Sequence, residues 1–169
     1  MAVNKQTFNS VGGFAVNETP VINDTRDVLN VNTLEIKNIN YSDSTKKNYI
    51  LKGTNTAILS IDNSNTPLNL NSNTINFITA HIVAVNASGS GHLSVKLESA
   101  VTCNASGDVQ VLSELLTTIK DSVPSGETWT IISYDSGAAN KFSYAATRGG
   151  TIVAIKWFAH VEVVSVLWS

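Results

Sequence analysis

The sequence predicts an all-β protein in which an extended N-terminal arm or short β-fibre precedes a C-terminal β-sandwich. Apolar and polar residues alternate at a period of two along much of residues 77–169, and Gly, Ser and Asn separate these runs. Sixteen asparagines precede Phe77 and three follow it. This break predicts a docking arm over residues 1–40, an Asn-rich β shaft over 41–76 and a jelly-roll-like sandwich over 77–169.

The arm and shaft contain only short apolar pairs, such as Leu34 with Ile36 and Leu68 with Leu70, separated by polar residues. Ordering each residue costs about 1 to 2 kcal/mol, and such sparse pairs bury too little area within one chain to offset that cost. This part is therefore either disordered or ordered by partners. We favour three copies wound around a common axis, which predicts a homotrimer.

Residues 77–98 give the clearest strand signal. An apolar run over 77–85 meets a Ser-Gly turn at 88–91, and strict alternation follows from 92 to 98. This pattern predicts a β-hairpin that covers a core on one side only.

Two further turns, at residues 104–108 and 124–127, bound a segment of ambiguous period. Within residues 112–123 the apolar side chains fit helical spacing, whereas Thr117 and Thr118 are β-branched and Pro124 prevents continuation. We favour a strand because the surrounding segments are strand-like. The residues with helical spacing are Leu112, Leu115, Leu116 and Ile119.

The C-terminal segment, residues 151–168, begins after Gly149 and Gly150 and carries apolar residues on one parity. It predicts one long strand, or two joined by a bulge, that ties the C-terminus into a sheet. With the preceding segments it gives six to eight strands, which is typical of a β-sandwich.

Composition and charge exclude several classes of function. The net charge is -2, the pI is near 5.8, and the 11 Lys and Arg residues are scattered, so we expect no nucleic-acid binding. The sequence has no apolar run of about 18 residues and no signal-peptide pattern, which predicts synthesis in the cytoplasm without membrane insertion.

No residue pattern indicates a cofactor, a metal or a catalytic group. Cys103 is the single cysteine and predicts a buried, unreactive thiol. His81, His92 and His160 stand singly, and only Glu162 lies near one of them at ligand spacing. A metal at His160 and Glu162 needs further ligands, which three copies around an axis could supply.

The carboxylates at turns favour local backbone hydrogen bonds over catalysis. These residues are Asp108, Asp121, Glu127 and Asp135. We therefore predict that the chain is not an enzyme.

A candidate receptor-facing loop lies in the aromatic-rich C-terminal part. Residues 135–140 form a polar loop between two tyrosines, an arrangement suited to binding a host surface glycan. The candidate residues are Tyr134, Asp135, Asn140 and Tyr144.

Residues 12–31 begin with Gly-Gly-Phe and continue through a turn to Val-Ile-Asn, Arg, Leu and Asn-Val. This segment resembles one in virion appendage proteins of tailed phages, especially cyanophage-like ones, with Ile22-Asn23 in place of the commoner Ile-Asp. Residues 77–168 are also similar in texture to trimeric knobs or jelly rolls of phage fibres and capsid decorations. The matching docking residues are Phe14, Val16, Val21, Ile22, Arg26, Leu29 and Val31.

The resemblance implies a non-enzymatic structural protein of a phage virion. In this reading a short trimeric fibre or spike docks on capsid or tail proteins by its arm and presents a β domain for host or surface adhesion. One alternative is a capsid decoration or cement protein that stabilises the shell. A more remote alternative is a carbohydrate-active tail spike enzyme.

Overall fold

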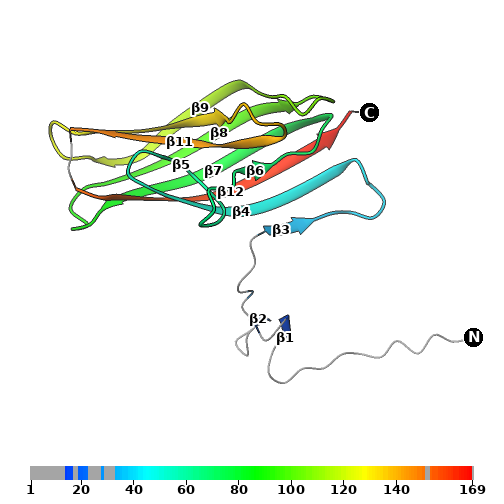
Figure 1. The fold of residues 1–169 in the computed structure, drawn as a ribbon, viewed down its shortest axis with the longest axis horizontal. Coiled ribbons are helices and arrows are strands. Elements are labelled where there is room, and N and C mark those ends of the chain that lie inside the picture. Colours follow the sequence, from blue (N-terminus) through cyan, green and yellow to red (C-terminus); the bar gives the residue numbers. More distant parts are fainter. Residues whose placement is uncertain (1–13, 17–18, 23–27, 29–32, 151–152, 169) are drawn as a thin grey trace, which may run out of the picture. The chain divides into compact units, whose positions relative to one another are not determined.

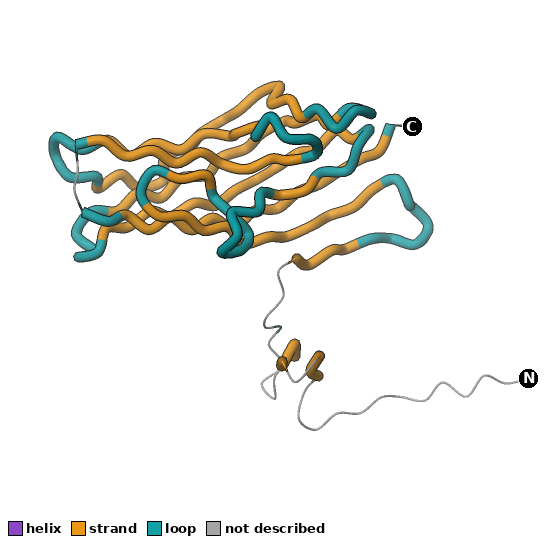
Figure 2. Tube along the Cα trace, viewed as in Figure 1, coloured by secondary structure: helices purple, strands orange, loops and turns teal. Residues whose placement is uncertain are grey.

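The structure, a computed structural model, describes residues 14–16, 19–22, 28, 33–150 and 153–168. These residues form strands, turns and bends without a helix, so the all-β prediction is confirmed (Figure 2). The chain divides into two compact units, Met1–Asn32 and Thr33–Ser169.

The N-terminal unit contains a small antiparallel hairpin. Strand β1 (Phe14–Val16) pairs with β2 (Thr19–Ile22), and Ile22 forms a further bridge to Val28. Four of the predicted docking residues lie on this hairpin, and the other three lie outside the described residues. The first group is Phe14, Val16, Val21 and Ile22, and the second is Arg26, Leu29 and Val31.

The second unit is a two-layer antiparallel β-sandwich (Figure 1). The first layer has six strands, which in spatial order are β3 (Thr33–Ile36), β4 (Ser44–Thr54), β12 (Ile155–Leu167), β7 (Thr74–Asn86), β8 (His92–Cys103) and β9 (Val109–Ser122). The second layer contains β10 (Thr128–Asp135), β11 (Lys141–Gly149), β5 (Ala57–Ile58) and β6 (Leu68–Asn69), with β5 and β6 both paired to β11.

The C-terminal strand is central in the larger layer. Strands β7, β8 and β9 form a meander, β10 and β11 form a hairpin in the other layer, and β12 returns to lie between β4 and β7. The predicted hairpin over residues 77–98 is thus confirmed as β7 and β8. The layers have six and four strands, unlike the eight strands of a jelly roll.

The core lies between the two layers and follows the period of two. Alternate residues of β12 and β8 are buried, and their neighbours point away from the core. Trp157 is the largest of the fully buried side chains, and its ring lies 6.5 Å from that of Trp129 in an edge-to-face arrangement. These two tryptophans join the layers at one place in the core.

The shaft predicted for residues 41–76 is wrong, because these residues belong to the sandwich. Strand β4 pairs along its whole length with β12, and Leu51, Leu59 and Leu68 are fully buried. The few apolar side chains of these residues are enough to order them, because strands later in the sequence supply the rest of the core. The compact unit therefore begins at Thr33 and not after Asn76.

Some of the asparagines before residue 77 occupy left-handed turn positions. Among the described residues, every non-glycine residue with a positive φ is an asparagine, and three of these four precede residue 77. Asparagine tolerates this left-handed conformation because its short side chain hydrogen-bonds locally. The four are Asn55, Asn65, Asn73 and Asn140.

Two bulges explain the helical spacing in residues 112–123. The strand prediction is confirmed, but the register of β9 against β8 slips at Leu112 and again at Ile119, each of which has no partner opposite it. Each bulge adds one residue to the strand, so apolar residues that would otherwise be two positions apart are three apart, as in a helix. The pattern therefore came from an irregular strand.

Candidate functional site

The four residues predicted to face a receptor do not share one surface. Tyr144 lies in the core with its ring edge-on to Phe142, because the period of β11 turns both side chains inward. The Asn140 side chain donates hydrogen bonds to the Leu70 carbonyl (2.9 Å) and to Ser72 Oγ (3.0 Å). The prediction for Tyr144 is corrected, because it is a core residue, whereas Asn140 is half-buried and fixes a turn.

Tyr144 carries a buried hydroxyl with no hydrogen-bond partner among the described residues. Burial raises the pKa of this phenol, with a smaller contribution from Glu114. An unsatisfied buried hydroxyl costs about 1 to 3 kcal/mol. The hydroxyl therefore destabilises the core that its ring helps to fill.

We expect Tyr144→Phe to raise the free energy of unfolding by about 1 kcal/mol, because it removes the unsatisfied hydroxyl and keeps the ring. Since the folded-state pKa is raised, the wild type loses stability as the pH rises past the ordinary tyrosine value of about 10, and the variant loses less. Urea denaturation at neutral and alkaline pH measures both effects. Tyr134→Phe, at a half-buried site, is the control, and a less stable Tyr144→Phe would contradict the assignment.

Tyr134 and Asp135 line two different hollows. Tyr134 borders one of about 480 Å³ together with Ile58 and Pro67. Asp135 borders another of about 290 Å³ beside Gly107. A ligand that fills either hollow meets only one of the predicted receptor residues.

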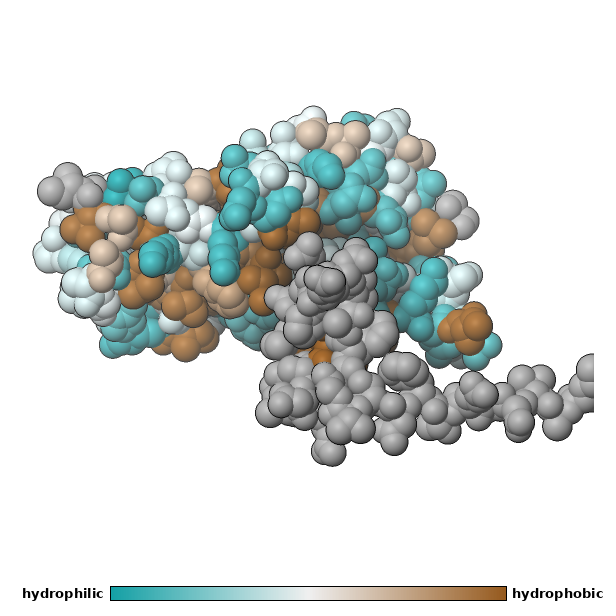
Figure 3. All heavy atoms as spheres, turned by 60° about the horizontal axis from the view of Figure 1, so that its bottom comes forward, coloured by the Kyte–Doolittle hydropathy of each residue, from teal (hydrophilic) through white to brown (hydrophobic). Residues whose placement is uncertain are grey.

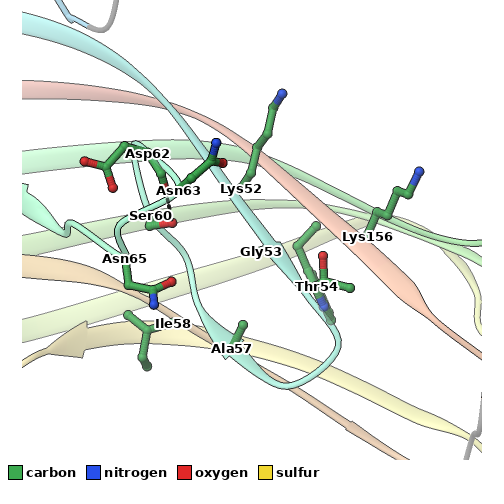
Figure 4. Close-up of a pocket in the computed structure, with 11 residues that line it drawn as sticks. Lys52, Gly53, Thr54, Ala57, Ile58, Ser60, Asp62, Asn63, Asn65 and Lys156 are labelled. Carbon is green, nitrogen blue, oxygen red and sulfur yellow. Dashed lines mark hydrogen bonds between the residues drawn. The ribbon is translucent and has the colours of Figure 1, made fainter.

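A larger hollow of about 520 Å³ adjoins the one at Tyr134 (Figure 4). Asp62 on its rim accepts hydrogen bonds from the backbone of Ser64 (2.8 Å) and Thr66 (3.1 Å), and the interactions with Thr66 lower the pKa of its carboxyl group. The ammonium groups of Lys52 and Lys156 extend away from the hollow. Its lining therefore offers polar surface without a convergent acid and base.

The turn carboxylates are engaged locally. Asp108 accepts from Asn104 Nδ2 (2.8 Å), Asp121 from the Val123 backbone (2.9 Å), and Glu127 from Trp129 Nε1 (2.9 Å). Each of these interactions stabilises a turn or a nearby side chain, as the turn positions predict.

The described residues contain no group of three His, Cys, Asp or Glu side chains that could hold a metal. Glu162, the candidate ligand beside His160, instead pairs with Lys46 at 2.6 Å. His160 stacks on His81, with ring centroids 6.4 Å apart. Cys103 is buried, and burial raises the pKa of its thiol.

The most extensive feature is the outer face, defined as the side of the six-stranded sheet turned away from the core. It carries exposed apolar side chains beside polar ones, as Figure 3 shows for part of the sandwich surface. Ten large apolar residues on this face are 39–60% exposed. They are Leu34, Ile36, Ile50, Ile75, Phe77, Val83, Leu115, Phe158, Val164 and Val166.

Strand pairing arranges the outer face in rows across the sheet. One row runs from Leu115 through Glu98, Thr79, Glu162 and Asn48 to Leu34. The sequence prediction missed this face, although residues 75–85 are apolar on both parities, which is typical of a strand that is covered on both sides.

The fold and this surface define a two-layer antiparallel β-sandwich with one broad, partly apolar sheet face. In the described part of the chain, no helix is long and apolar enough to cross a membrane. No protein-family model and no curated protein matches the chain.

Among solved structures, the chain is similar to tailspike protein gp49 from Acinetobacter baumannii bacteriophage Fri1, a capsular polysaccharide depolymerase. The TM-score is 0.45 and the sequence identity is 16%. The match covers 80% of this chain and 20% of the tailspike chain, so the chain spans about one fifth of that protein's length.

Proposed function

We propose that this chain is a non-enzymatic structural protein of a phage virion, a short homotrimeric fibre or spike. In this proposal the N-terminal unit docks on a capsid or tail protein, and the sandwich presents a surface for adhesion to the host. The single observation that carries it is the outer face, whose ten exposed apolar side chains gather on one sheet. Exposed apolar side chains gathered on one face are typical of protein interaction sites.

Two further observations support a structural role. The segment at residues 12–31 resembles docking segments of phage appendage proteins. The carboxylates Asp108, Asp121 and Glu127 are each held by hydrogen bonds to nearby groups, an arrangement that serves local structure.

Gold-labelled antibody against the purified chain tests the location on particles of the phage that encodes it. We expect label at the tail or at discrete projections, and we expect the purified protein to bind host cells. Even label over the capsid, with greater heat resistance of empty shells after addition of the protein, would replace the fibre with a cement protein. Absence of label from the particle contradicts both.

Incubation with purified host capsular polysaccharide tests the non-enzymatic assignment. We expect no increase in reducing ends over hours at micromolar protein, because Asp108, Asp121 and Glu127 are each engaged in local hydrogen bonds. Boiled protein is the control. A steady, protein-dependent release of reducing ends would overturn the assignment.

A further inference from the structure

We propose that three copies of the chain turn their outer faces toward a common axis that runs parallel to the strands. In this arrangement the β9 edge of each copy packs beside the β3 edge of the next. The inference rests on the proposed homotrimer and adds which surface forms it. A heterologous contact of this kind closes into a ring when the rotation between copies is 120°.

The size of the outer face fits such an assembly. With about 4.8 Å between strands and 3.3 Å per residue, six strands of up to about 13 residues give a face near 24 Å by 43 Å, or about 1,000 Å². Each face meets two neighbours, so about 500 Å² of it faces each one, and each copy buries about 1,000 Å² in all, above the roughly 800 Å² that one partner buries in a standard interface. Three sheets about 24 Å wide, arranged as the sides of a triangular prism, each lie about 7 Å from the common axis. Two packed sheets lie about 10 Å apart, so each is about 5 Å from the plane midway between them, which is a similar distance.

The two edges of the sheet match in height. Leu115 on β9 and Leu34 on β3 lie at opposite ends of the same row. Rotation about an axis parallel to the strands keeps every row at its height, so it brings Leu115 of one copy beside Leu34 of the next. Both side chains are at least half exposed within one copy.

The β9 edge favours contact through side chains over extension of the sheet. Its two bulges interrupt the ladder and leave Leu112 and Ile119 exposed, and such bulges prevent strand addition at open edges. Two faces stacked as a dimer would leave these residues beside the sheet uncovered. A neighbouring copy at a corner of the prism covers them.

The charges on the outer face are compatible with burial. Lys46 pairs with Glu162 at 2.6 Å and Lys96 with Glu98 at 2.9 Å, so these charges are compensated within each copy. Lys52, Lys120 and Lys156 lie in the two rows at the other end of the sheet from Phe77, where the prism opens to water. The compensated pairs therefore lie in the middle rows and in the adjoining row of Phe77 and Val164.

Sedimentation equilibrium of the full chain tests the surface. We expect three times the 18.0 kDa mass for the wild type and a monomer for Phe77→Lys, which places a charge near the axis. Ile132→Lys is the matched control, since Ile132 is 54% exposed on the smaller layer and Phe77 is 52% exposed. It should remain a trimer, and circular dichroism should show both variants folded.

A trimeric Phe77→Lys, a monomeric Ile132→Lys or a dimeric wild type would each overturn the proposed surface. The two variant results would leave the homotrimer and the location on the virion standing, whereas a dimeric wild type would also reject the homotrimer. A folded monomeric wild type would reject the trimer, whereas location on the particle would still be decided by labelling.

A cysteine pair tests the edge contact directly. In a Leu34→Cys/Leu115→Cys variant the two cysteines of one chain lie about 24 Å apart, five strand spacings, far beyond the 7 Å limit for a disulfide. Mild oxidation should therefore give covalent dimers and trimers, with the ladder ending at three. A ladder ending at two, or no cross-linking above the single variants, would overturn the arrangement.

Discussion

Trp157→Ala is expected to lower the free energy of unfolding by about 3 to 5 kcal/mol, the range for removing a buried Trp or Phe side chain. Trp157 is 1% exposed and lies on the central strand β12, where it packs edge-on against Trp129 of the other layer. Its loss opens a cavity where the two layers meet. The more the surrounding core collapses into the cavity, the smaller the loss of unfolding free energy within this range.

The same substitution also removes a hydrogen bond. Trp157 Nε1 donates to the Asn55 carbonyl (2.8 Å), and Asn55 is further bound to Ile155 through its backbone N–H (2.8 Å) and its side-chain oxygen (3.1 Å). Asn55 holds a left-handed turn at the end of β4. Loss of the indole therefore weakens the pairing of β4 with β12 as well as the core.

Urea denaturation at one fixed protein concentration measures the effect, because the stability of an oligomer depends on concentration. Trp168→Ala is the control: it makes the same substitution at a side chain that is 52% exposed, and we expect a change below about 1 kcal/mol. Equal losses at both positions would contradict the central role of Trp157.

Period-two alternation predicted the β7–β8 hairpin and the C-terminal strand because each of these segments contains enough apolar residues to define its own buried face. The same reasoning failed for β4, whose Leu51 is buried by strands that come about a hundred residues later. Local sequence does not report such long-range partners. Asparagine content indicated a change of structure at Asn76, whereas the chain shows left-handed turns at Asn55, Asn65 and Asn73 within the sandwich itself.

The candidate receptor loop failed for a related reason. A tyrosine beside a polar loop has the same local sequence whether its ring points inward or outward, and only the register of β11 places Tyr144 in the core. Tyr134, directly before the loop on the neighbouring strand, borders a hollow instead. The sequence predicted the turn correctly. It could not show whether the tyrosines on either side of the turn point into the core or toward solvent.

Asn76→Ala is expected to lower the free energy of unfolding by about 2 to 3 kcal/mol, because Asn76 is a buried polar residue that joins three strands. Its Nδ2 donates to Thr74 Oγ1 (3.0 Å) and to the Val101 carbonyl of β8 (3.2 Å). Its Oδ1 accepts from Ser165 Oγ of β12 (2.5 Å). Alanine leaves the buried Ser165 hydroxyl without this acceptor.

A double-mutant cycle with Ser165→Ala separates the hydrogen bond from the packing. When both side chains are removed, no hydroxyl is left unsatisfied, so we expect the double variant to lose less than the sum of the two single losses, by about 0.5 to 2 kcal/mol. Asn63→Ala, at an exposed position, is the control and should change little. Strict additivity would show that Asn76 and Ser165 act independently, and would contradict a stabilising hydrogen bond between β7 and β12 at this point.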